Sequence, residues 1–548
     1  MRSVLFLAVV GCGIGEGVGT VPGPGAADTG GSPSDGTSAT DGTDGTDGTD
    51  GADGTGSGND ATDALVDAMD IDRLMGHLDA LQAIADAHDA TRLAGTPGYD
   101  NSADYVEQQL SDAGLTVTRQ PFAWVLWDEV DRPVLTTSLD RTFSYGSDFA
   151  TLGYSPPGDA SGPLVAVDLN LPPGAENSST SGCEASDFGG FPAGAVALIQ
   201  RGSCTFAQKA SNAEAAGAVG VIIFNEGQSG RRDVVEGVLD DANLPSIPVL
   251  AASFDAGEAL AAAVDAGAVS ARVVVNTELA ERPVDNLWVD LPGDSDQIIV
   301  VGGHLDSVQA GPGINDNGSG TALVLELALQ AAAQDLPREH TLRFAFWGAE
   351  EAGLIGSFVY VDGLTDAEVS QHLANLNFDM VASPNGGRFI YDGDGSEGLD
   401  GYPAPAGSDL IEGLFTGFFD TRDLAWRGTA FDGRSDYGPF IYAGIPAGGL
   451  FTGAEGIHTS GEADSWGGDA GEPYDACYHR GCDSVENIDE VLFLEMSQAA
   501  AHATAELARV ESLGARAGIA RGDLPRPTHH IDPDARHDFG GCAQKPRR

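Results

Sequence analysis

The second half of the chain alternates short apolar segments with longer apolar segments of helical length, and this alternation restricts the fold more than any other feature. Residues 298–301 form a β-branched run, residues 320–333 are apolar enough for a buried helix, and residues 342–347 are again strand-like. Four more segments continue the series: strands at 373–378, 388–391 and 445–451, and an amphipathic helix at 491–507. This order predicts a doubly wound, mostly parallel α/β sheet with helices on both faces.

The 548-residue chain is too long for one hydrophobic core, because single cores rarely exceed about 250–300 residues. Between residues 146 and 278 the texture changes to short strands, at 164–167, 195–199 and 220–224, with one helical stretch at 205–216. We therefore predict an inserted, mainly β domain at 146–278 that divides the α/β domain into residues 63–145 and 279–510.

The first part of the α/β domain has its own helical signals. Apolar residues at helical spacing predict a helix over residues 71–84, and a second helix should follow with Asn101 or Ser102 as its cap. Alternation at residues 115–118 then predicts a strand.

The first 12 residues have the pattern of an export signal. Arg2 precedes an apolar run at residues 4–10 that is too short to span a bilayer, and Gly11 and Cys12 follow it. The sequence Val-Val-Gly-Cys resembles a bacterial lipobox, in which Cys12 would carry a lipid; an ordinary secretory signal is the alternative. No later segment reaches about 18 apolar residues without charge, so we expect an extracytoplasmic protein, secreted or lipid-anchored at a bacterial cell envelope.

Two segments have compositions that cannot form a core. Residues 13–62 are almost only Gly, Asp, Thr, Ser, Ala and Pro, with a threefold Asp-Gly-Thr repeat, and predict a disordered tether. Calcium binding by this repeat is disfavoured because flexible single carboxylates would have to be ordered. Residues 511–548 lack periodicity and predict a disordered tail.

The formal net charge of −56 excludes binding to nucleic acid, because so negative a chain repels nucleic acid, and it repels anionic lipid surfaces as well. The six cysteines do not form the closely spaced pairs of a zinc ribbon.

Side chains of the kind that bind metals follow three of the predicted strands. In chain order they are His304 with Asp306, Glu350 with Glu351, and Asp379. One such carboxylate alone is more often a cap or a surface group. Ligands nevertheless gather at the carboxyl ends of parallel strands, so the coincidence predicts a metal site.

Asp316 lies in a glycine-rich turn, residues 313–320, that leads into the apolar helix. A phosphate-binding loop is the competing interpretation. The turn lacks the lysine and the spacing of a nucleotide loop, and its carboxylate would repel phosphate. A cation fits better, and a carboxylate here can bridge two metal ions about 3.5–4 Å apart.

Glu350 and Glu351 require separate roles, because neighbouring side chains on an extended backbone point in opposite directions. One can bind metal while the other faces a water molecule. Desolvation near an apolar pocket would raise the pKa of the free carboxyl group toward the working pH and make it a general base.

The remaining ligand should be a histidine, and His458 and His479 are the candidates late in the chain. His479 is favoured because Cys477 and Cys482 flank it, and a short disulfide in an oxidising compartment would fix this loop. Tyr478 beside it could donate a hydrogen bond to a developing oxyanion.

Together these residues resemble the M28 family of zinc peptidases, specifically its bacterial aminopeptidases with an inserted protease-associated (PA) domain. The resemblance rests on Arg92, Gly95-Thr96-Pro97-Gly98-Tyr99, His304-Leu305-Asp306-Ser307, Asn315-Asp316-Asn317-Gly318, Glu350-Glu351, Phe378-Asp379-Met380, Arg434-Ser435-Asp436-Tyr437, Gly448-Gly449-Leu450-Phe451 and Cys477-Tyr478-His479. It implies two zinc ions per chain, with these ligands: His304 and Asp379 for one ion, Glu351 and His479 for the other, and Asp316 between them. Glu350 would be the general base, and Asp306 would orient His304 from outside the ligand set.

The resemblance also implies a substrate pocket and disulfides. The pocket residues would be Met380, Arg434, Phe451 and Tyr478. The disulfides would be Cys477–Cys482 and, in the PA domain, Cys183–Cys204, which leaves Cys542 free or paired with another chain. Some family members bind calcium near the last helix, but residues 489–495 depart from that pattern, so we assign no calcium site.

The expected function is that of a monomeric dinuclear zinc aminopeptidase that removes N-terminal, preferably hydrophobic, residues from peptides or proteins with a free N-terminus. A carboxypeptidase or dipeptidase of the same family is one alternative. A non-catalytic receptor or adhesion module is another, and the presence of all five ligands and Glu350 argues against it.

Overall fold

The computed structural model describes residues 56–510 and 513, except 229–230, 236, 240–243 and 400. The helices and helical turns are α1 (Gly56–Ala68), α2 (Ile71–Ala87), α3 (Pro97–Asp112), η1 (Ala185–Phe188), α4 (Phe206–Ala215), α5 (Phe254–Ala266), η2 (Ile314–Ser319), α6 (Gly320–Ala333), α7 (Ile355–Asp362), α8 (Asp366–Gln371), α9 (Ser408–Asp420), α10 (Tyr437–Tyr442), α11 (Ser460–Trp466), η3 (Val485–Asn487) and α12 (Glu490–Leu507). The strands are β1 (Val117–Thr137), β2 (Phe149–Thr151), β3 (Gly158–Ala166), β4 (Val196–Gln200), β5 (Gly220–Phe224), β6 (Val249–Ala252), β7 (Ser270–Leu291), β8 (Ile298–His304), β9 (Thr341–Trp347), β10 (His372–Phe378), β11 (Phe389–Tyr391), β12 (Arg427–Thr429) and β13 (Ala447–Phe451).

The predicted export signal, Cys12, the tether as far as residue 55, the tail from residue 514 and Cys542 lie outside the described residues. Within the described part of the chain, no helix combines the length and the apolarity needed to cross a bilayer.

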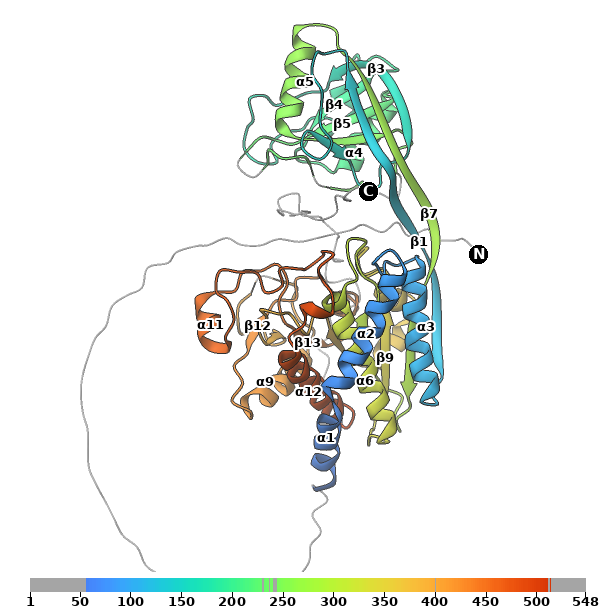
Figure 1. Ribbon diagram of the computed structural model, residues 1–548, viewed down its shortest axis with the longest axis vertical. Coiled ribbons are helices and arrows are strands. Elements are labelled where there is room, and N and C mark those ends of the chain that lie inside the picture. Colours follow the sequence, from blue (N-terminus) through green and yellow to red (C-terminus); the bar gives the residue numbers. More distant parts are fainter. Residues whose placement is uncertain are drawn as a thin grey trace, which may run out of the picture.

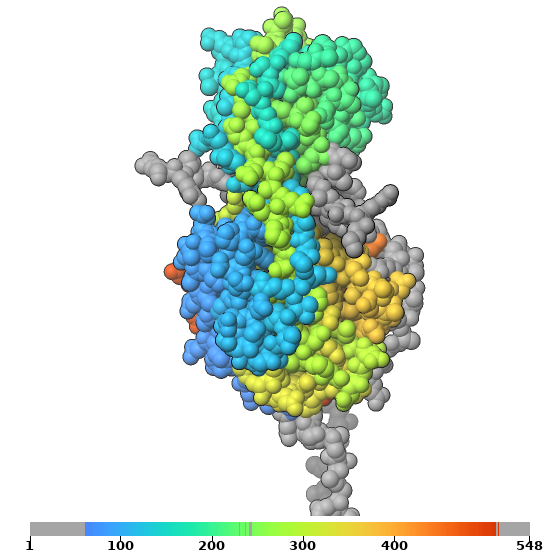
Figure 2. Space-filling view, turned by 90° about the vertical axis from the view of Figure 1, so that its right-hand side faces the viewer, coloured from blue at the N-terminus to red at the C-terminus, as the bar shows by residue number. Residues whose placement is uncertain are grey.

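The strands form one hydrogen-bonded network that extends through two lobes. Their order is β12-β11-β13-β10-β8-β9-β7-β3-β4-β5-β6-β2, with β1 paired to β7. β1 and β7 run antiparallel from the pair Val117–Val289 to the pair Thr137–Ala271. Figure 1 shows this two-stranded ribbon passing from the lower lobe into the upper lobe, and in Figure 2 the lime-coloured β7 crosses the narrow waist between them.

The lower lobe has the predicted doubly wound sheet. β8 pairs in parallel with β9 and β10, and β10 pairs in parallel with β13. β7 and β11 add antiparallel partners on either side. This arrangement confirms the fold class predicted from the alternation of strands and helices.

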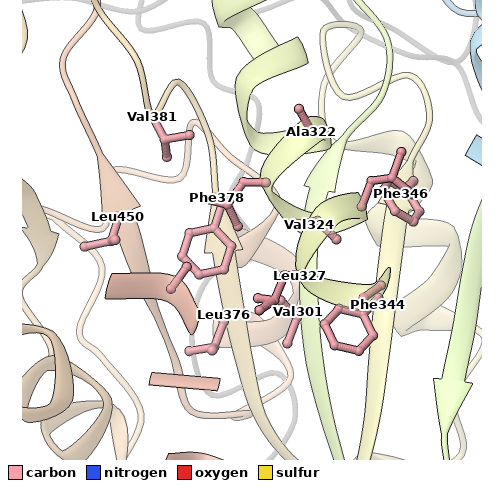
Figure 3. Packing of buried hydrophobic residues seen from close by; sticks show 14 of the residues in the cluster. Val301, Ala322, Val324, Leu327, Phe344, Phe346, Leu376, Phe378, Val381 and Leu450 are labelled. Carbon is pink, nitrogen blue, oxygen red and sulfur yellow. The ribbon is translucent and has the colours of Figure 1, made fainter. Parts of the chain in front are cut away.

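Successive side chains of each strand point to opposite faces, so each face has its own core. Val301 and Phe344 lie in the larger cluster, to which α1, α2, α3, α6, α9 and α12 contribute. Val300 and Trp347 lie in a smaller cluster with residues of α7, α8 and α10. Figure 3 shows α6 packed on the larger side, with Leu327 among Val301 and Phe344. Helix α6 is apolar around most of its circumference because it is buried between the sheet and α2.

The upper lobe contains the predicted insertion, but its core extends further than residues 146–278. β3, β4, β5 and β6 pair in parallel, and α4 and α5 pack against them. Leu135 of β1 and Phe143 are buried in the same core. The predicted boundary near residue 146 is therefore too late, because β1 enters the lobe without any loop that composition could reveal.

Three other local predictions differ from the structure. Helix α3 begins at Pro97, which is favoured in a first turn, and not after Asn101 or Ser102. Helix α1 begins at Gly56, inside the predicted tether, because its buried Leu65 anchors it to the larger core. Leu513, inside the predicted tail, is buried in that core as well.

Lys209 of α4 is fully buried in the upper lobe. Its Nζ donates a hydrogen bond to the carbonyl oxygen of Ser181 at 2.7 Å and lies 3.5 Å from Sγ of Cys183. Burial lowers the pKa of Lys209 to about 8, because the charged ammonium group loses its hydration.

This lysine should make the stability of the upper lobe depend on pH. Below about pH 8, Lys209 is protonated in both the folded and the unfolded protein. Above about pH 8 it loses its proton in the folded protein but keeps it in the unfolded chain, where the pKa has its ordinary value of 10.5. Stability should therefore rise with pH, by about 1 kcal/mol between pH 7 and pH 9 relative to a Lys209→Met variant. Hydrogen exchange of the β4 and β5 amides measures this local free energy. Parallel pH profiles for the two proteins would contradict the prediction.

Candidate metal centre

The metal-type side chains predicted at strand ends do meet at one edge of the lower sheet. His304 is the last residue of β8, Glu350 and Glu351 follow β9, and Asp379 follows β10. Parallel pairing places the ends of these strands side by side, with His304 opposite Trp347. The turn η2 lies in contact with β8 and contributes Asp316.

Two groups of ligand atoms share Asp316. Nε2 of His304 lies 3.4 Å from Oδ1 of Asp316 and 3.3 Å from Oδ1 of Asp379. Nε2 of His479 lies 3.1 Å from Oδ2 of Asp316 and 3.1 Å from Oε2 of Glu351. Within each group, the potential ligand atoms all lie within 4.8 Å of one another. The carboxylate of Asp316 therefore faces both histidines, one with each oxygen.

The residues present fit a pair of divalent cations. Nε2 of His304, Oε1 of Glu351 and Oδ1 of Asp379 are buried and have no hydrogen-bond partner among the described residues. Buried polar atoms without partners are costly, and a cation coordinated by them would remove that cost. Imidazole nitrogens and carboxylate oxygens in sets of three are the donor atoms of catalytic zinc sites.

The electrostatics of the site also favour a cation. Burial raises the pKa of Glu351 to about 7. Burial lowers the pKa of His304, but the carboxylates of Glu350 and Asp379 outweigh this effect and hold it well above its usual value. The negative charge of the carboxylates thus exceeds the positive charge that the two histidines can supply, and a bound cation would stabilise these carboxylates.

Glu350 is buried beside the first group without belonging to it. Its Oε2 lies 3.8 Å from Nε2 of His304, further than the oxygens of Asp316 and Asp379. Burial raises the pKa of Glu350 well above its usual value, and the neighbouring carboxylate of Asp379 raises it further, although His304 opposes the shift. A carboxyl group in this state is suited to accept a proton near neutral pH.

We expected Asp306 to orient His304, and the structure shows that it contacts this histidine mainly through its backbone. Its carboxylate is 3.7 Å from Nδ1 of His304, and the nearer atom is its backbone carbonyl oxygen, at 3.3 Å. The two carboxylate oxygens instead accept the backbone N–H groups of Glu350 and Glu351, at 3.1 and 3.3 Å. Asp306 therefore holds the loop of the two glutamates as well as the imidazole.

The two candidate histidines have different surroundings. Nδ1 of His458 lies 2.9 Å from the carbonyl oxygen of Asn385, and its Nε2 accepts a hydrogen bond from Nε1 of Trp466 at 3.1 Å. Both ring nitrogens of this buried histidine are thus used in an aromatic cluster. The structure brings only His479 to the carboxylates.

The predicted pocket residues lie around His479 and Asp379. The ring of Tyr478 stacks on that of His479 with centroids 3.8 Å apart, and its hydroxyl group accepts a hydrogen bond from Nη2 of Arg434 at 3.1 Å. Arg434 also pairs with Glu455, at 3.0 Å, a contact that the sequence did not suggest.

Met380 and Phe451 occupy the neighbouring strand ends. Met380 is buried, and its carbonyl oxygen accepts the backbone N–H of Thr452. Phe451 packs on Phe389, with ring centroids 6.2 Å apart.

Both predicted disulfides are present, Cys183–Cys204 in the upper lobe and Cys477–Cys482 around His479. The second closes a loop in which His479 has a left-handed φ of 56°. Ala349, next to Glu350, and Met380, next to Asp379, also have positive φ values. Such backbones are unfavourable for residues other than glycine and often accompany functional sites.

Arg92 belongs to the predicted motifs, but the sequence did not suggest its role. Its guanidinium group is fully buried and donates hydrogen bonds to the carbonyl oxygens of Leu305, Pro312 and Gly313. It thereby connects the loop after His304 to the turn that carries Asp316.

Another group of carboxylates, Asp392, Asp394 and Glu412, lies beyond the end of β11. β11 is antiparallel to β13, so its carboxyl end points away from the edge that carries the candidate metal ligands. Asp392 and Glu412 each accept two backbone N–H groups, and we assign no ion to this group. Near the last helix, Asp489 caps α12 and Glu495 pairs with Arg388.

Comparisons with known proteins agree with the geometry. Residues 286–504 match peptidase family M28, and residues 160–260 match the PA domain. An aminopeptidase of Pseudomonas aeruginosa is 46% identical over 418 residues, which cover 75% of this chain and 76% of that protein. A probable lipoprotein aminopeptidase of Mycobacterium tuberculosis is 39% identical over 431 residues, which cover 78% of this chain and 82% of that protein.

Solved structures are similar over most of their length. An aminopeptidase from Aneurinibacillus sp. strain AM-1 has a TM-score of 0.63 at 27% identity, covering 83% of this chain and 97% of that one. A zinc aminopeptidase from Bacillus subtilis has a TM-score of 0.55 at 26% identity, covering 81% of this chain and 96% of that one.

Replacing each candidate histidine should separate their roles. His479→Ala should bind less zinc than the unmodified protein and lose at least about 100-fold in peptidase activity, since even changes outside the ligand set cost 10–100-fold. His458→Leu should keep its zinc and lose about 1–3 kcal/mol of stability, because it leaves half-buried groups of Asn385 and Trp466 unpaired. Metal analysis and urea unfolding measure the two effects. Full zinc content in His479→Ala would exclude it as a ligand.

Proposed function

Because the chain belongs to peptidase family M28 and is a zinc aminopeptidase, we propose that it acts outside the cytoplasm and binds two zinc ions in a single active site. One ion would be held by His304 and Asp379, the other by Glu351 and His479, and both by Asp316. The observation that carries this proposal is the position of Asp316, whose two oxygens face two different histidines at 3.4 and 3.1 Å. A carboxylate shared in this way suits two neighbouring cations better than one.

Bound zinc would supply Lewis-acid charge that polarises the peptide carbonyl group and lowers the pKa of a water molecule toward neutrality. Glu350 takes a proton from the attacking water, for which its raised pKa prepares it. The same carboxyl group then donates this proton to the leaving amine. Tyr478, held between His479 and Arg434, places its hydroxyl group beside the site, where it can donate to the developing oxyanion.

The site should select substrates with a free amino terminus. The carboxylates at the sheet edge attract a protonated α-amino group, which would limit cleavage to the first residue of a peptide. Met380 and Phe451 offer apolar contacts beside Asp379, so we propose that the removed residue is preferentially hydrophobic.

Two further features support an extracytoplasmic location. The described residues contain two disulfides, which persist in oxidising compartments and are rare in the cytoplasm. One relative is described as a probable lipoprotein aminopeptidase. Lipidation of Cys12, the fate of Cys542 and a monomeric state stay predictions.

A Glu350→Gln variant should keep its zinc and lose about 10²–10⁴-fold in kcat on a leucine anilide, because it removes only the proton acceptor. The acid limb of the pH–rate profile should disappear with it, since activity in the unmodified protein falls as Glu350 becomes protonated. Glu412→Gln is the matched control, because Glu412 is also buried and its pKa is also raised by burial. Activity near that of the unmodified protein in Glu350→Gln would exclude this residue as the base.

Blocking either end of a peptide should reveal which end is cleaved. N-acetylation should lower kcat/KM by at least about 100-fold, because it removes a charge that pairs with buried carboxylates. Amidation of the C-terminus of a longer peptide should have little effect. The opposite pattern would indicate a carboxypeptidase.

A further inference from the structure

Asp483 is a buried carboxylate that the mechanism does not use. It directly follows Cys482 and therefore lies immediately after the disulfide loop that presents His479. Its exposed fraction is 2%. Neither charge pattern nor strand position in the sequence distinguishes it from a surface residue.

The side chain of Asp483 accepts two consecutive backbone N–H groups of the turn η2. Oδ1 accepts the N–H of Asn315 at 2.8 Å, and Oδ2 accepts the N–H of Asp316 at 3.0 Å. The backbone carbonyl oxygen of Asp483 accepts the N–H of Ile314 at 3.2 Å. Three successive amides, of Ile314, Asn315 and Asp316, are thus bonded to the residue that immediately follows the loop carrying His479.

Asp306 makes the equivalent contact on the other side of the site. It lies two residues after His304, and its carboxylate accepts the N–H groups of Glu350 and Glu351. In both cases an aspartate that follows a histidine binds the backbone of the loop that supplies carboxylates. The repeated arrangement indicates a common purpose, which is to set the distance between a histidine and its carboxylate partners.

We propose that Asp483 is a positioning residue for the zinc ion that His479 and Glu351 would hold, because it fixes the distance between His479 and Asp316. This inference rests on the proposed two-zinc site. Asp483 does not belong to either group of candidate ligand atoms. Its carboxylate holds Asp316 so that Oδ2 stays 3.1 Å from Nε2 of His479. The ion at His304 and Asp379 would share Asp316, but its other two ligands do not depend on this contact, so we expect it to be affected less than the ion at His479 and Glu351.

The chemistry of the contact explains why an aspartate is required. The side chain of an aspartate has two oxygens, and each can accept one of two parallel N–H groups. An asparagine of the same shape offers one oxygen, and its NH₂ group would face the second backbone N–H. Asp483→Asn should therefore displace η2 from the His479 loop without changing the volume of the side chain.

The experiment measures zinc binding by Asp483→Asn, Asp392→Asn and the unmodified full-length protein. Asp392 is the matched control, because it is also buried and accepts two backbone N–H groups, from Ser396 and Glu397, away from the metal ligands. Competition with a zinc chelator should show that Asp483→Asn binds one of two ions about 10–100-fold more weakly. Asp392→Asn should bind both ions as the unmodified protein does. Added zinc should restore much of the kcat of Asp483→Asn, which a general loss of folding would not allow.

The outcomes separate this inference from the proposed function. Fewer than two zinc ions in the unmodified protein would overturn the two-zinc site itself. Two ions there, with equal affinities in Asp483→Asn, would overturn only the role of Asp483. An equal loss in Asp392→Asn would also overturn it, because the effect would then be one of stability. If Asp483→Asn does not fold, Asp483→Ser provides the same test, since its hydroxyl group accepts one N–H and leaves room for water.

Discussion

The carboxylates of Asp316, Glu350, Glu351 and Asp379 meet two histidines in a buried space, and their mutual repulsion is the constraint on which the surrounding structure depends. Buried like charges repel strongly and relax apart unless the backbone that carries them is held in place. The contacts around the site provide this restraint. Buried Arg92 ties the loop after His304 to the turn of Asp316, and the aspartates that follow the two histidines bind the opposite loops. A cation would then find its donors arranged before it binds, so that little reorganisation opposes binding.

The parallel sheet is the reason that this restraint is possible. Its strands place His304, the two glutamates and Asp379 on three adjacent ends, and the packed cores on both faces keep those ends in register. The packed cores also offset the free-energy cost of unfavourable backbone conformations near the site. Ala349, Met380 and His479 have left-handed backbones, each unfavourable by about 1–2 kcal/mol. A rigid sheet and a disulfide can hold such conformations, whereas a mobile loop would relax from them.

The parts that could be predicted from the sequence are those governed by local pattern. The strand at residues 298–301, the helix at 320–333 and the carboxylates after three strands all follow from periodicity and from the chemistry of strand ends, and the structure has them in these places. His479 could be preferred over His458 only through flanking cysteines and family resemblance, because neither histidine follows a strand. Asp483, Glu455 and the true contacts of Asp306 were beyond prediction, since each depends on loops that are distant in sequence and adjacent only after folding. The early start of the upper lobe was missed for the same reason: β1 is continuous, and its second half pairs with a strand more than 130 residues later.

The continuous ribbon of β1 and β7 has a consequence for how the protein is assembled. Because the chain enters and leaves the upper lobe on two paired strands, the whole lobe is the loop of one very long β-hairpin. The entropy of closing a loop grows only slowly with its length, so an insertion of this size adds little to the closure cost for the lower lobe. The edge that carries the candidate metal ligands belongs to β8, β9 and β10, none of which crosses the waist. The hairpin arrangement thus lets the inserted lobe vary in size and sequence while the sheet that presents the candidate ligands keeps its register.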